Sequence, residues 1–343
     1  MLSSVGDLWP DVERTYARET LACRPFEFLG LPVRLYSNGQ TALSLLEASY
    51  EEFLSESASS ADVASMYVIE TESNEGRRYE MVDPGFDAFV SDDVSQAVAC
   101  WGAQLMGNHL FRQRFLFVHG SVLAGPEGGV WIFFGASQAG KTTLAFKLLA
   151  HGHAFYSDEF APISVDTGLI HPFPRSLFLR RTERVPVPVP DAVLDACPAF
   201  DDHQDARAQE APPRRTIVPP ARLPGVNIAR HAAEPAALYV LDGFSEGPTK
   251  VRPTTPPYAL KFVLDNATNP SYLDAESKRL ALETVVGLLK TTPCFSVTLG
   301  PASERPEVLA DVFKRARAAW VRPPTEELDR LAARCRALLE VDT

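Results

Sequence analysis

The sequence lacks the features that mark several large classes of protein. Its cysteines are odd in number, widely spaced and never arranged as C-x-x-C: Cys23, Cys100, Cys197, Cys294 and Cys335. Neither a disulfide framework nor a cysteine zinc site is therefore expected. No stretch approaches the roughly 18 apolar residues of a membrane span, and the N-terminus has no signal-peptide pattern. We expect a soluble, cytoplasmic protein without a membrane partner.

Clustered positive charge is also scarce. The 33 Lys and Arg residues are outnumbered by 44 Asp and Glu residues, so the formal net charge is -11. Binding to nucleic acid or anionic lipid depends on clustered Lys and Arg. We therefore expect no nucleic-acid partner, although a site for a triphosphate and Mg2+ needs only a few local cations.

The composition is that of an ordinary globular protein, with 45% hydrophobic and 22% charged residues in a chain of 343. That length suits two units, because single cores usually stop growing near about 250 to 300 residues. We expect a smaller N-terminal α/β domain at 1–95, which would bind a substrate or partner. A P-loop domain at 96–322 and a C-terminal helix at 323–343 would follow it.

Apolar periodicity predicts the elements of the first part of the chain. We expect a strand at 28–35, a helix at 41–54, and strands at 64–70 and 78–82 joined as a hairpin. A long helix is expected at 92–111, since acidic residues favour a helix N-terminus. Two buried strands, 115–123 and 130–134, should follow, separated by a glycine-rich turn.

A proline-rich segment interrupts the second part at 185–223. Little regular sheet is expected there, because proline cannot donate to a β-ladder. A functional flap and an insertion without a role in chemistry are both open interpretations. Around this segment the pattern predicts strands at 237–241, 250–252 and 294–299, and helices at 257–266, 274–290, 305–320 and 325–339.

A phosphate-binding loop is the strongest motif. Residues 135–142 read Gly-Ala-Ser-Gln-Ala-Gly-Lys-Thr and fit G-x-x-x-x-G-K-[ST], between a predicted strand and a predicted helix at 141–150. Backbone N–H groups and the helix N-terminus can hold phosphate, Lys141 can reach the β and γ phosphates, and Thr142 can ligate Mg2+. The predicted nucleotide-binding residues are Gly135, Ser137, Gln138, Ala139, Gly140, Lys141, Thr142 and Thr143.

An acidic pair follows soon after this loop. Asp158 and Glu159 lie on a predicted strand at 153–163, which comes directly after the P-loop helix. In a compact unit, such a strand can bring both carboxylates beside the γ phosphate. One could complete the Mg2+ shell while the other accepts a proton from an attacking hydroxyl. A solvated strand end is the alternative interpretation.

Together these segments resemble the HPr serine kinase/phosphorylase catalytic domain and its HPr-kinase-related relatives. The resemblance covers about residues 110 to 320. It is carried by Val118-His119-Gly120-Ser121, the P-loop and its helix, Ser157-Asp158-Glu159, and the segment from Pro172 to Arg180. It implies an α/β fold of the P-loop HPr kinase C-terminal type, similar to PEP carboxykinase.

The resemblance also implies roles for individual residues. Asp158 would be the general base, Glu159 and Thr142 would serve the metal, His119 would lie near the phosphates, and Arg175 would face substrate or the transferring phosphoryl group. Two positions depart from the family pattern: Glu159 stands where aspartate is commoner, and Gln138 where glycine is usual. The resemblance further implies a homo-oligomer, since relatives often form rings.

From the residues alone, His119 could equally be a core histidine. Arg175 could be satisfied by a phosphate or by an internal carboxylate.

Two functions remain open from the sequence. The first is an ATP- and Mg2+-dependent kinase that transfers the γ phosphate to a hydroxyl, a serine of a protein or peptide acceptor by family similarity. The second is a nucleotide-binding accessory protein of a peptide-modification system that transfers no phosphate. The N-terminal region shows no match to the family's regulatory domain.

Overall fold

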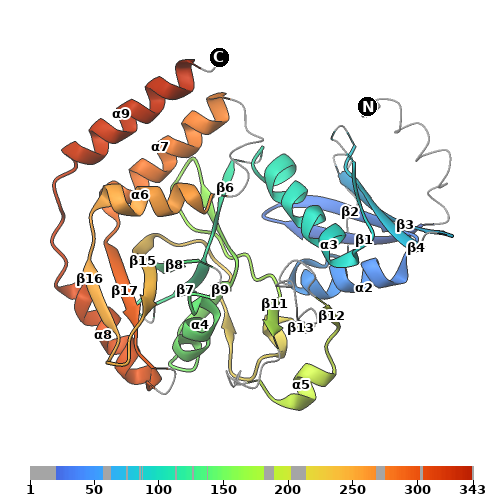
Figure 1. Ribbon diagram of the computed structural model, residues 1–343, viewed down its shortest axis with the longest axis horizontal. Coiled ribbons are helices and arrows are strands. Elements are labelled where there is room, and N and C mark those ends of the chain that lie inside the picture. The colour runs from blue at the N-terminus through green and yellow to red at the C-terminus, as the bar shows by residue number, and fades with distance from the viewer. Residues whose placement is uncertain are drawn as a thin grey trace. The chain divides into compact units, whose positions relative to one another are not determined.

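The chain forms a mixed α/β protein with several sheets, the largest of seven strands (Figure 1). The computed structural model describes residues 21–56, 63–112, 114–180, 189–201, 214–267, 275–301 and 304–341, apart from 75, 85, 87, 126 and 137. The predicted α/β class is confirmed. Within the described residues, no helix is both long and apolar enough to cross a membrane.

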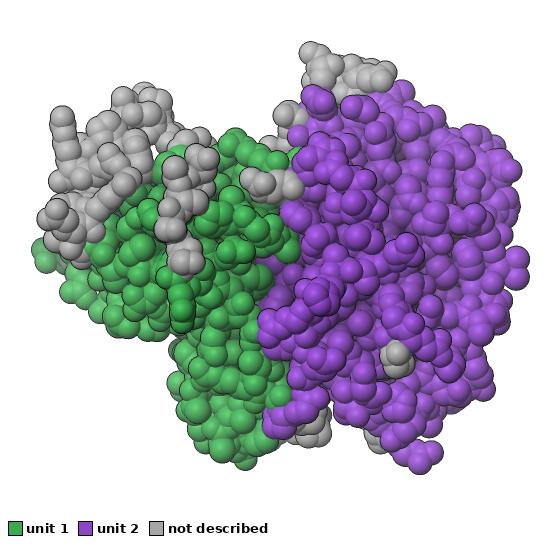
Figure 2. All heavy atoms as spheres, turned by 180° about the vertical axis from the view of Figure 1, so that it is seen from behind, with its two compact units in different colours: residues 1–113, 175–223 green, residues 114–174, 224–343 purple. Residues whose placement is uncertain are grey.

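Two compact units make up the chain (Figure 2). Unit 1 comprises residues 1–113 and 175–223, and unit 2 comprises 114–174 and 224–343. This grouping assigns the proline-rich segment to the same unit as the N-terminal part of the chain. The predicted boundary at residue 95 lies inside a helix of unit 1, Val94–Gln104.

Unit 1 contains a five-stranded sheet in the order β1-β2-β3-β4-β5. Phe26 and Phe28 of β1 are fully buried, and both rings lie 6.0 Å from the ring of Trp101 on α3. The elements are β1 (Ala22–Phe28), β2 (Leu31–Ser37), α2 (Gln40–Ser49), a 3-10 turn η3 (Glu51–Phe53), β3 (Ala64–Ser73), β4 (Gly76–Val82), β5 (Phe89–Ser91), α3 (Val94–Gln104) and a π-helical turn η4 (Leu105–Leu110).

The prediction of one strand at 28–35 is wrong. The chain reverses there in a tight hairpin, with Leu29 and Gly30 at φ 52° and 85°. The apolar run continued through the turn, so hydrophobicity alone concealed it. The predicted strands at 64–70 and 78–82 and the helix starting near 92 are confirmed, and Asp93 caps that helix by accepting a bond from Ser95 N.

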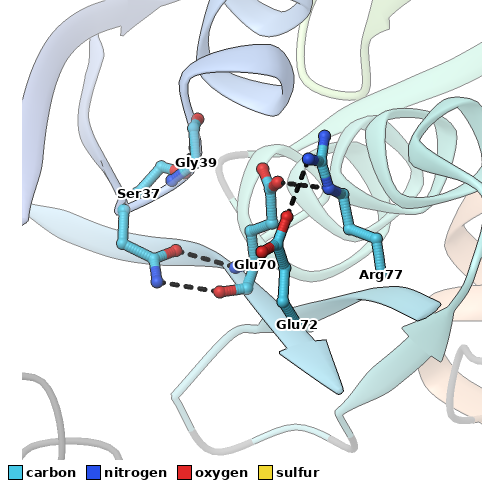
Figure 3. A network of polar contacts seen from close by, with 6 residues as sticks. Ser37, Gly39, Glu70, Glu72 and Arg77 are labelled. Carbon is cyan, nitrogen blue, oxygen red and sulfur yellow. Dashed lines mark hydrogen bonds and ion pairs between the residues drawn. The ribbon is translucent and has the colours of Figure 1, made fainter. Parts of the chain in front are cut away.

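A polar network fixes the turn between β2 and α2 to β3 (Figure 3). Asn38 Nδ2 donates to Glu70 O at 2.9 Å, and Glu70 N donates to Asn38 Oδ1 at 2.7 Å. Arg77 of β4 pairs with Glu70 at 2.9 Å and with Glu72 at 2.8 Å. Sequence-distant groups are therefore held together by polar contacts as well as by the aromatic core.

The second sheet of unit 1 has three strands in the order β11-β13-β12. Its elements are β11 (Leu177–Arg180), α5 (Asp191–Asp195), β12 (Ala199–Asp201), β13 (Arg214–Val218) and η6 (Pro220–Arg222). The expectation of little regular sheet at 185–223 is thus wrong, because the prolines flank these strands: Pro198 precedes β12, and Pro219 follows β13. Residues 185–188 and 202–213 lie outside the described residues.

Unit 2 is organised around the seven-stranded sheet, in the order β14-β9-β7-β8-β15-β17-β16. Strands β8, β15 and β17 run parallel, whereas β7 and β16 are antiparallel to their neighbours β8 and β17. Its strands are β7 (Ser121–Ala124), β8 (Val130–Phe134), β9 (Ala154–Ser157), β14 (Asn227–Ile228), β15 (Pro235–Phe244), β16 (Lys250–Pro253) and β17 (Cys294–Leu299).

The described part of this unit contains the helices α4 (Lys141–Leu149), α6 (Pro256–Asp265), α7 (Ala275–Thr291), α8 (Pro306–Ala318) and α9 (Glu326–Val341). The predictions of these helices and of the strands at 130–134, 237–241, 250–252 and 294–299 are confirmed, with small shifts of their ends. The buried apolar faces of α6, α7 and α8 account for the periodicity that predicted them.

Two predicted strands, 115–123 and 153–163, are each divided in two. The first becomes β6 (Phe115–His119) and β7, and the second becomes β9 and β10 (Phe160–Ser164). Strands β6 and β10 form a separate two-stranded sheet, whereas β7 and β9 pair in the large one. Gly120 lies at the first break, where an added Cβ would stand 2.9 Å from Phe133 O.

An aromatic cluster forms the centre of unit 2. The Tyr239 ring stacks between Phe133 and Phe295, with centroids 5.0 and 5.3 Å away, and Phe313 of α8 meets it edge-on at 4.7 Å. Tyr239 is fully buried, and its hydroxyl has no hydrogen-bond partner among the described residues. Burying an unpaired hydroxyl costs about 1 to 3 kcal/mol.

We therefore expect Tyr239→Phe to raise the free energy of unfolding by about 1 kcal/mol, because it removes the unpaired hydroxyl. Tyr156→Phe is the matched control, since the Tyr156 hydroxyl donates to His231 O at 2.7 Å. That variant should lose about 1 kcal/mol. Urea denaturation of both variants measures the effect. A loss of stability in Tyr239→Phe would mean that a bound water satisfies the hydroxyl.

Candidate functional site

The phosphate loop connects β8 to α4 in unit 2. Gly135 follows the buried strand β8, and an added Cβ there would stand 3.0 Å from Ala139 Cβ and 3.1 Å from Leu241 Cβ. Gly140 has φ 91° and Gln138 has φ 66°, so both are in the left-handed region that favours glycine. A glycine at position 138 would adopt this conformation without the steric cost that Gln138 carries. Ser137 lies outside the described residues.

The loop ends at the N-terminus of α4, whose first-turn backbone N–H groups have no acceptor within the helix itself. The first amide bonded within the helix is that of Leu144, which donates to Gly140 O at 2.9 Å. No side chain caps the helix. The amides of Lys141, Thr142 and Thr143 precede Leu144 in the first turn, and such groups together with the helix dipole favour phosphate.

Lys141 folds back over the loop. Its Nζ donates to Gly135 O at 2.8 Å and to Ala136 O at 3.1 Å. The pKa of Lys141 is lowered, because the effect of burial outweighs the opposing effect of the nearby charges of Asp158 and Glu159. The predicted lysine and the predicted acidic pair are thus brought together.

A hydrogen bond joins the loop to the acidic pair. Thr142 Oγ1 donates to Asp158 Oδ2 at 2.8 Å, and Asp158 is only 8% exposed. Burial raises the pKa of Asp158 to about 7. The hydrogen bond from Thr142 opposes this rise by more than the charge of Glu159 adds to it, and Ser121 and Lys141 oppose it further. The other carboxylate oxygen, Oδ1, is buried and has no hydrogen-bond partner among the described residues.

Glu159 and His119 lie on either side of the same break in the sheet. Gly120 N donates to Glu159 O at 2.9 Å, and His119 pairs with Phe160 across β6 and β10. The His119 ring meets the Phe160 ring edge-on, with centroids 6.0 Å apart. His119 is therefore next to the acidic pair along the backbone ladder, and its role near the phosphates stays a prediction.

The break also lets adjacent carboxylates serve one site. In a regular strand, Asp158 and Glu159 would point to opposite faces. Here they form the bend between β9 and β10, and Ser157 Oγ accepts bonds from Glu159 N and Phe160 N. Both carboxylates consequently act on the pKa of Lys141.

Arg175 belongs to unit 1, whereas the other predicted catalytic residues belong to unit 2. Its guanidinium carbon lies 5.2 Å from the centre of the Tyr50 ring and 4.5 Å from that of Phe178, and the residue is buried. Cation–π contacts of this kind stabilise a buried guanidinium. The predicted role of Arg175 toward substrate or phosphate stays a prediction.

Sequence reasoning assigned no role to two polar residues near the loop. Ser121, fully buried, influences the pKa of Asp158 from the position directly after the His119-Gly120 pair. Asp242 ends the apolar run of β15, the parallel neighbour of β8, and bonds to Ser296 Oγ. Asp242 could have been found from the sequence, since it is a carboxylate that directly follows a buried apolar run. Ligands often bind at the carboxyl ends of parallel strands.

The donor set suits a hard cation held mainly by a nucleotide. Within the residues described, no three His, Cys, Asp or Glu side chains form a group that could hold a metal ion by themselves. Mg2+ usually binds through one or two protein oxygens together with phosphates and water. Thr142 Oγ1, the unpartnered Asp158 Oδ1 and the Glu159 carboxylate fit that requirement.

No protein-family model matches this chain, and a search of curated proteins found no significant match. The HPr-kinase resemblance therefore rests on the motifs themselves.

The raised pKa of Asp158 predicts a pH dependence of stability. The pKa of this carboxyl is 3.8 in its ordinary state and about 7 in the folded protein, so the folded state binds more protons between these values. Stability should therefore fall as pH rises from about 4 to 7, by up to ~1.4 kcal/mol per pH unit, and level off above that range. Asp158→Asn should lack this component.

Urea denaturation of wild type and Asp158→Asn across this pH range measures the difference. If the two free energies of unfolding change in parallel with pH, Asp158 is not protonated at an unusually high pH in the folded protein.

Proposed function

We propose that this chain is an ATP-dependent kinase that transfers the γ phosphate to a hydroxyl, a serine of a protein or peptide acceptor. The proposal is carried by the contact of Thr142 with Asp158, which places a buried carboxylate of pKa about 7 against the phosphate loop. A general base works best when its pKa is near the working pH. The fold assignment to the HPr kinase C-terminal type, similar to PEP carboxykinase, belongs to the same proposal.

In the reaction, the acceptor hydroxyl oxygen forms a bond to the γ phosphorus, and the bond from that phosphorus to the β–γ bridging oxygen breaks. Asp158 takes the hydroxyl proton, and ADP leaves. Lys141 and the first-turn amides of α4 bind the phosphate oxygens, so charge is stabilised by groups that are already in place. Mg2+, when bound, neutralises phosphate charge and orients the β and γ oxygens.

Thr142, Glu159 and His119 support these steps. Thr142 Oγ1 is the metal-side oxygen of the loop, and its hydrogen bond orients Asp158. Glu159 supplies a second carboxylate for the metal. His119, held next to the pair by β6, would lie near the phosphates. Asp158 is bonded to Thr142, the proposed metal ligand of the loop. The division of roles between Asp158 and Glu159 is therefore tested with separate variants.

We expect Asp158→Asn to lower the transfer rate by about 100-fold to 10,000-fold at saturating Mg2+, because the base is lost. Glu159→Gln should instead raise the Mg2+ concentration needed for half-maximal rate, with much of the rate recovered at high Mg2+. Transfer of label from γ-labelled ATP to polypeptides that copurify with this chain, identified by mass spectrometry, provides the measurement. Glu307→Gln, an exposed carboxylate on α8, is the control and should leave both values unchanged.

A wild-type protein that binds ATP but never transfers label would sink the kinase proposal and favour an accessory role. If Asp158→Asn transfers phosphate at the wild-type rate, the base is another group. A shift in Mg2+ requirement in Asp158→Asn but not in Glu159→Gln would exchange the roles of the two carboxylates.

A further inference from the structure

An exposed aromatic side chain adjoins the phosphate loop. Phe244, the last residue of β15, is 62% exposed. Two of its ring carbons lie 3.3 Å from the point where a Cβ would stand on Gly140. A single exposed apolar side chain is ordinary on a protein surface, but this one lies against the loop that precedes Lys141.

A bulge at the end of β15 sets the position of this ring. The pairing of β15 with β17 shifts between Leu241 and Gly243, so Asp242 is the extra residue, and Phe244 is opposite Leu299. Asp242 is held by its bond to Ser296. Bulges often redirect side chains beside functional sites.

Hydrogen bonds hold the loop that follows Phe244 in place. Thr249 accepts a bond from Gly300 N at 2.8 Å, and Thr249 N donates to Glu304 Oε1 at 3.1 Å. Lys147 of α4 donates to Glu304 O at 2.9 Å. The segment carrying Phe244 is therefore tied to the loop after β17 and to the helix that begins at the phosphate loop.

We propose that Phe244 is the stacking platform for the base of the bound nucleoside triphosphate. This inference rests on the proposed nucleotide binding at residues 135–142. A base is joined to its phosphates through a single ribose, so it must lie close to the loop, and every base has a flat face that can stack on an aromatic ring. Because hydrogen bonds already hold the segment that carries Phe244, stacking there does not require that segment to be ordered on binding.

Binding of ATP and of inorganic tripolyphosphate, both with Mg2+ and measured by calorimetry, tests the proposal. Tripolyphosphate uses the phosphate loop but has no base. Wild type should bind ATP more tightly than tripolyphosphate, and Phe244→Ala should weaken ATP binding about tenfold, within a range of ~5-fold to ~100-fold, while leaving tripolyphosphate binding unchanged. Phe244→Trp, which keeps an aromatic face, should retain ATP binding. Val321→Ala, 83% exposed in the same unit, is the surface control.

Equal ATP affinity in wild type and Phe244→Ala would overturn the stacking role, as would equal binding of ATP and tripolyphosphate by wild type. Parallel loss of both ligands in Phe244→Ala would also overturn it, because the ring would then support the loop rather than the base. If wild type binds neither ligand, nucleotide binding itself fails, and the platform with it. If wild type shows the expected pattern but transfers no phosphate, the platform stands and the kinase proposal fails.

Discussion

The hydrogen bond from Thr142 to Asp158 is the contact on which the candidate site depends. Thr142 is in the first turn of α4, and Asp158 lies in the bend after β9, so one bond of 2.8 Å fixes helix, loop and bend together. The same bond keeps one oxygen of a buried carboxylate satisfied while the other stays unpartnered among the described residues. An ionised carboxylate is costly in such surroundings, and this cost is the reason for its raised pKa.

The position of that carboxylate depends in turn on two coincident breaks in the sheet. Strands β6 and β7 separate at Gly120, and β9 and β10 separate at Asp158 and Glu159, on facing segments linked by the bond from Gly120 N to Glu159 O. A side chain at residue 120 would collide with Phe133 O. Glycine is thus required for residue 120 to pass so close to Phe133. The break in the strands at this point means that the two adjacent carboxylates need not point to opposite faces, as they would in a regular strand.

The sequence predicted which segments of the candidate site lie together better than it predicted how the chain turns between them. The Gly135–Thr142 pattern, its flanking strand and helix, and the proximity of Asp158 to Lys141 could all be inferred, because each depends on short segments. The strand breaks at Gly120 and Asp158 could not, since the apolar runs continue across them and the collision with Phe133 O is a tertiary contact. The sheet at 177–218 was also not predicted, because the segment is rich in proline. These prolines flank the strands and do not occupy the paired positions within them.

Charge adds a further constraint on what the loop can bind. Lys141 is the cation that the described contacts bring to the loop, and two carboxylates already act on it. A triphosphate placed there would face Asp158 and Glu159, and these like charges would repel one another. A divalent cation between carboxylates and phosphates would relieve this repulsion while Asp158 stays ionised, as its proposed role as base requires. Tight nucleotide binding at this loop should therefore depend on Mg2+, with Thr142 and the acidic pair as the protein groups that would contact the ion.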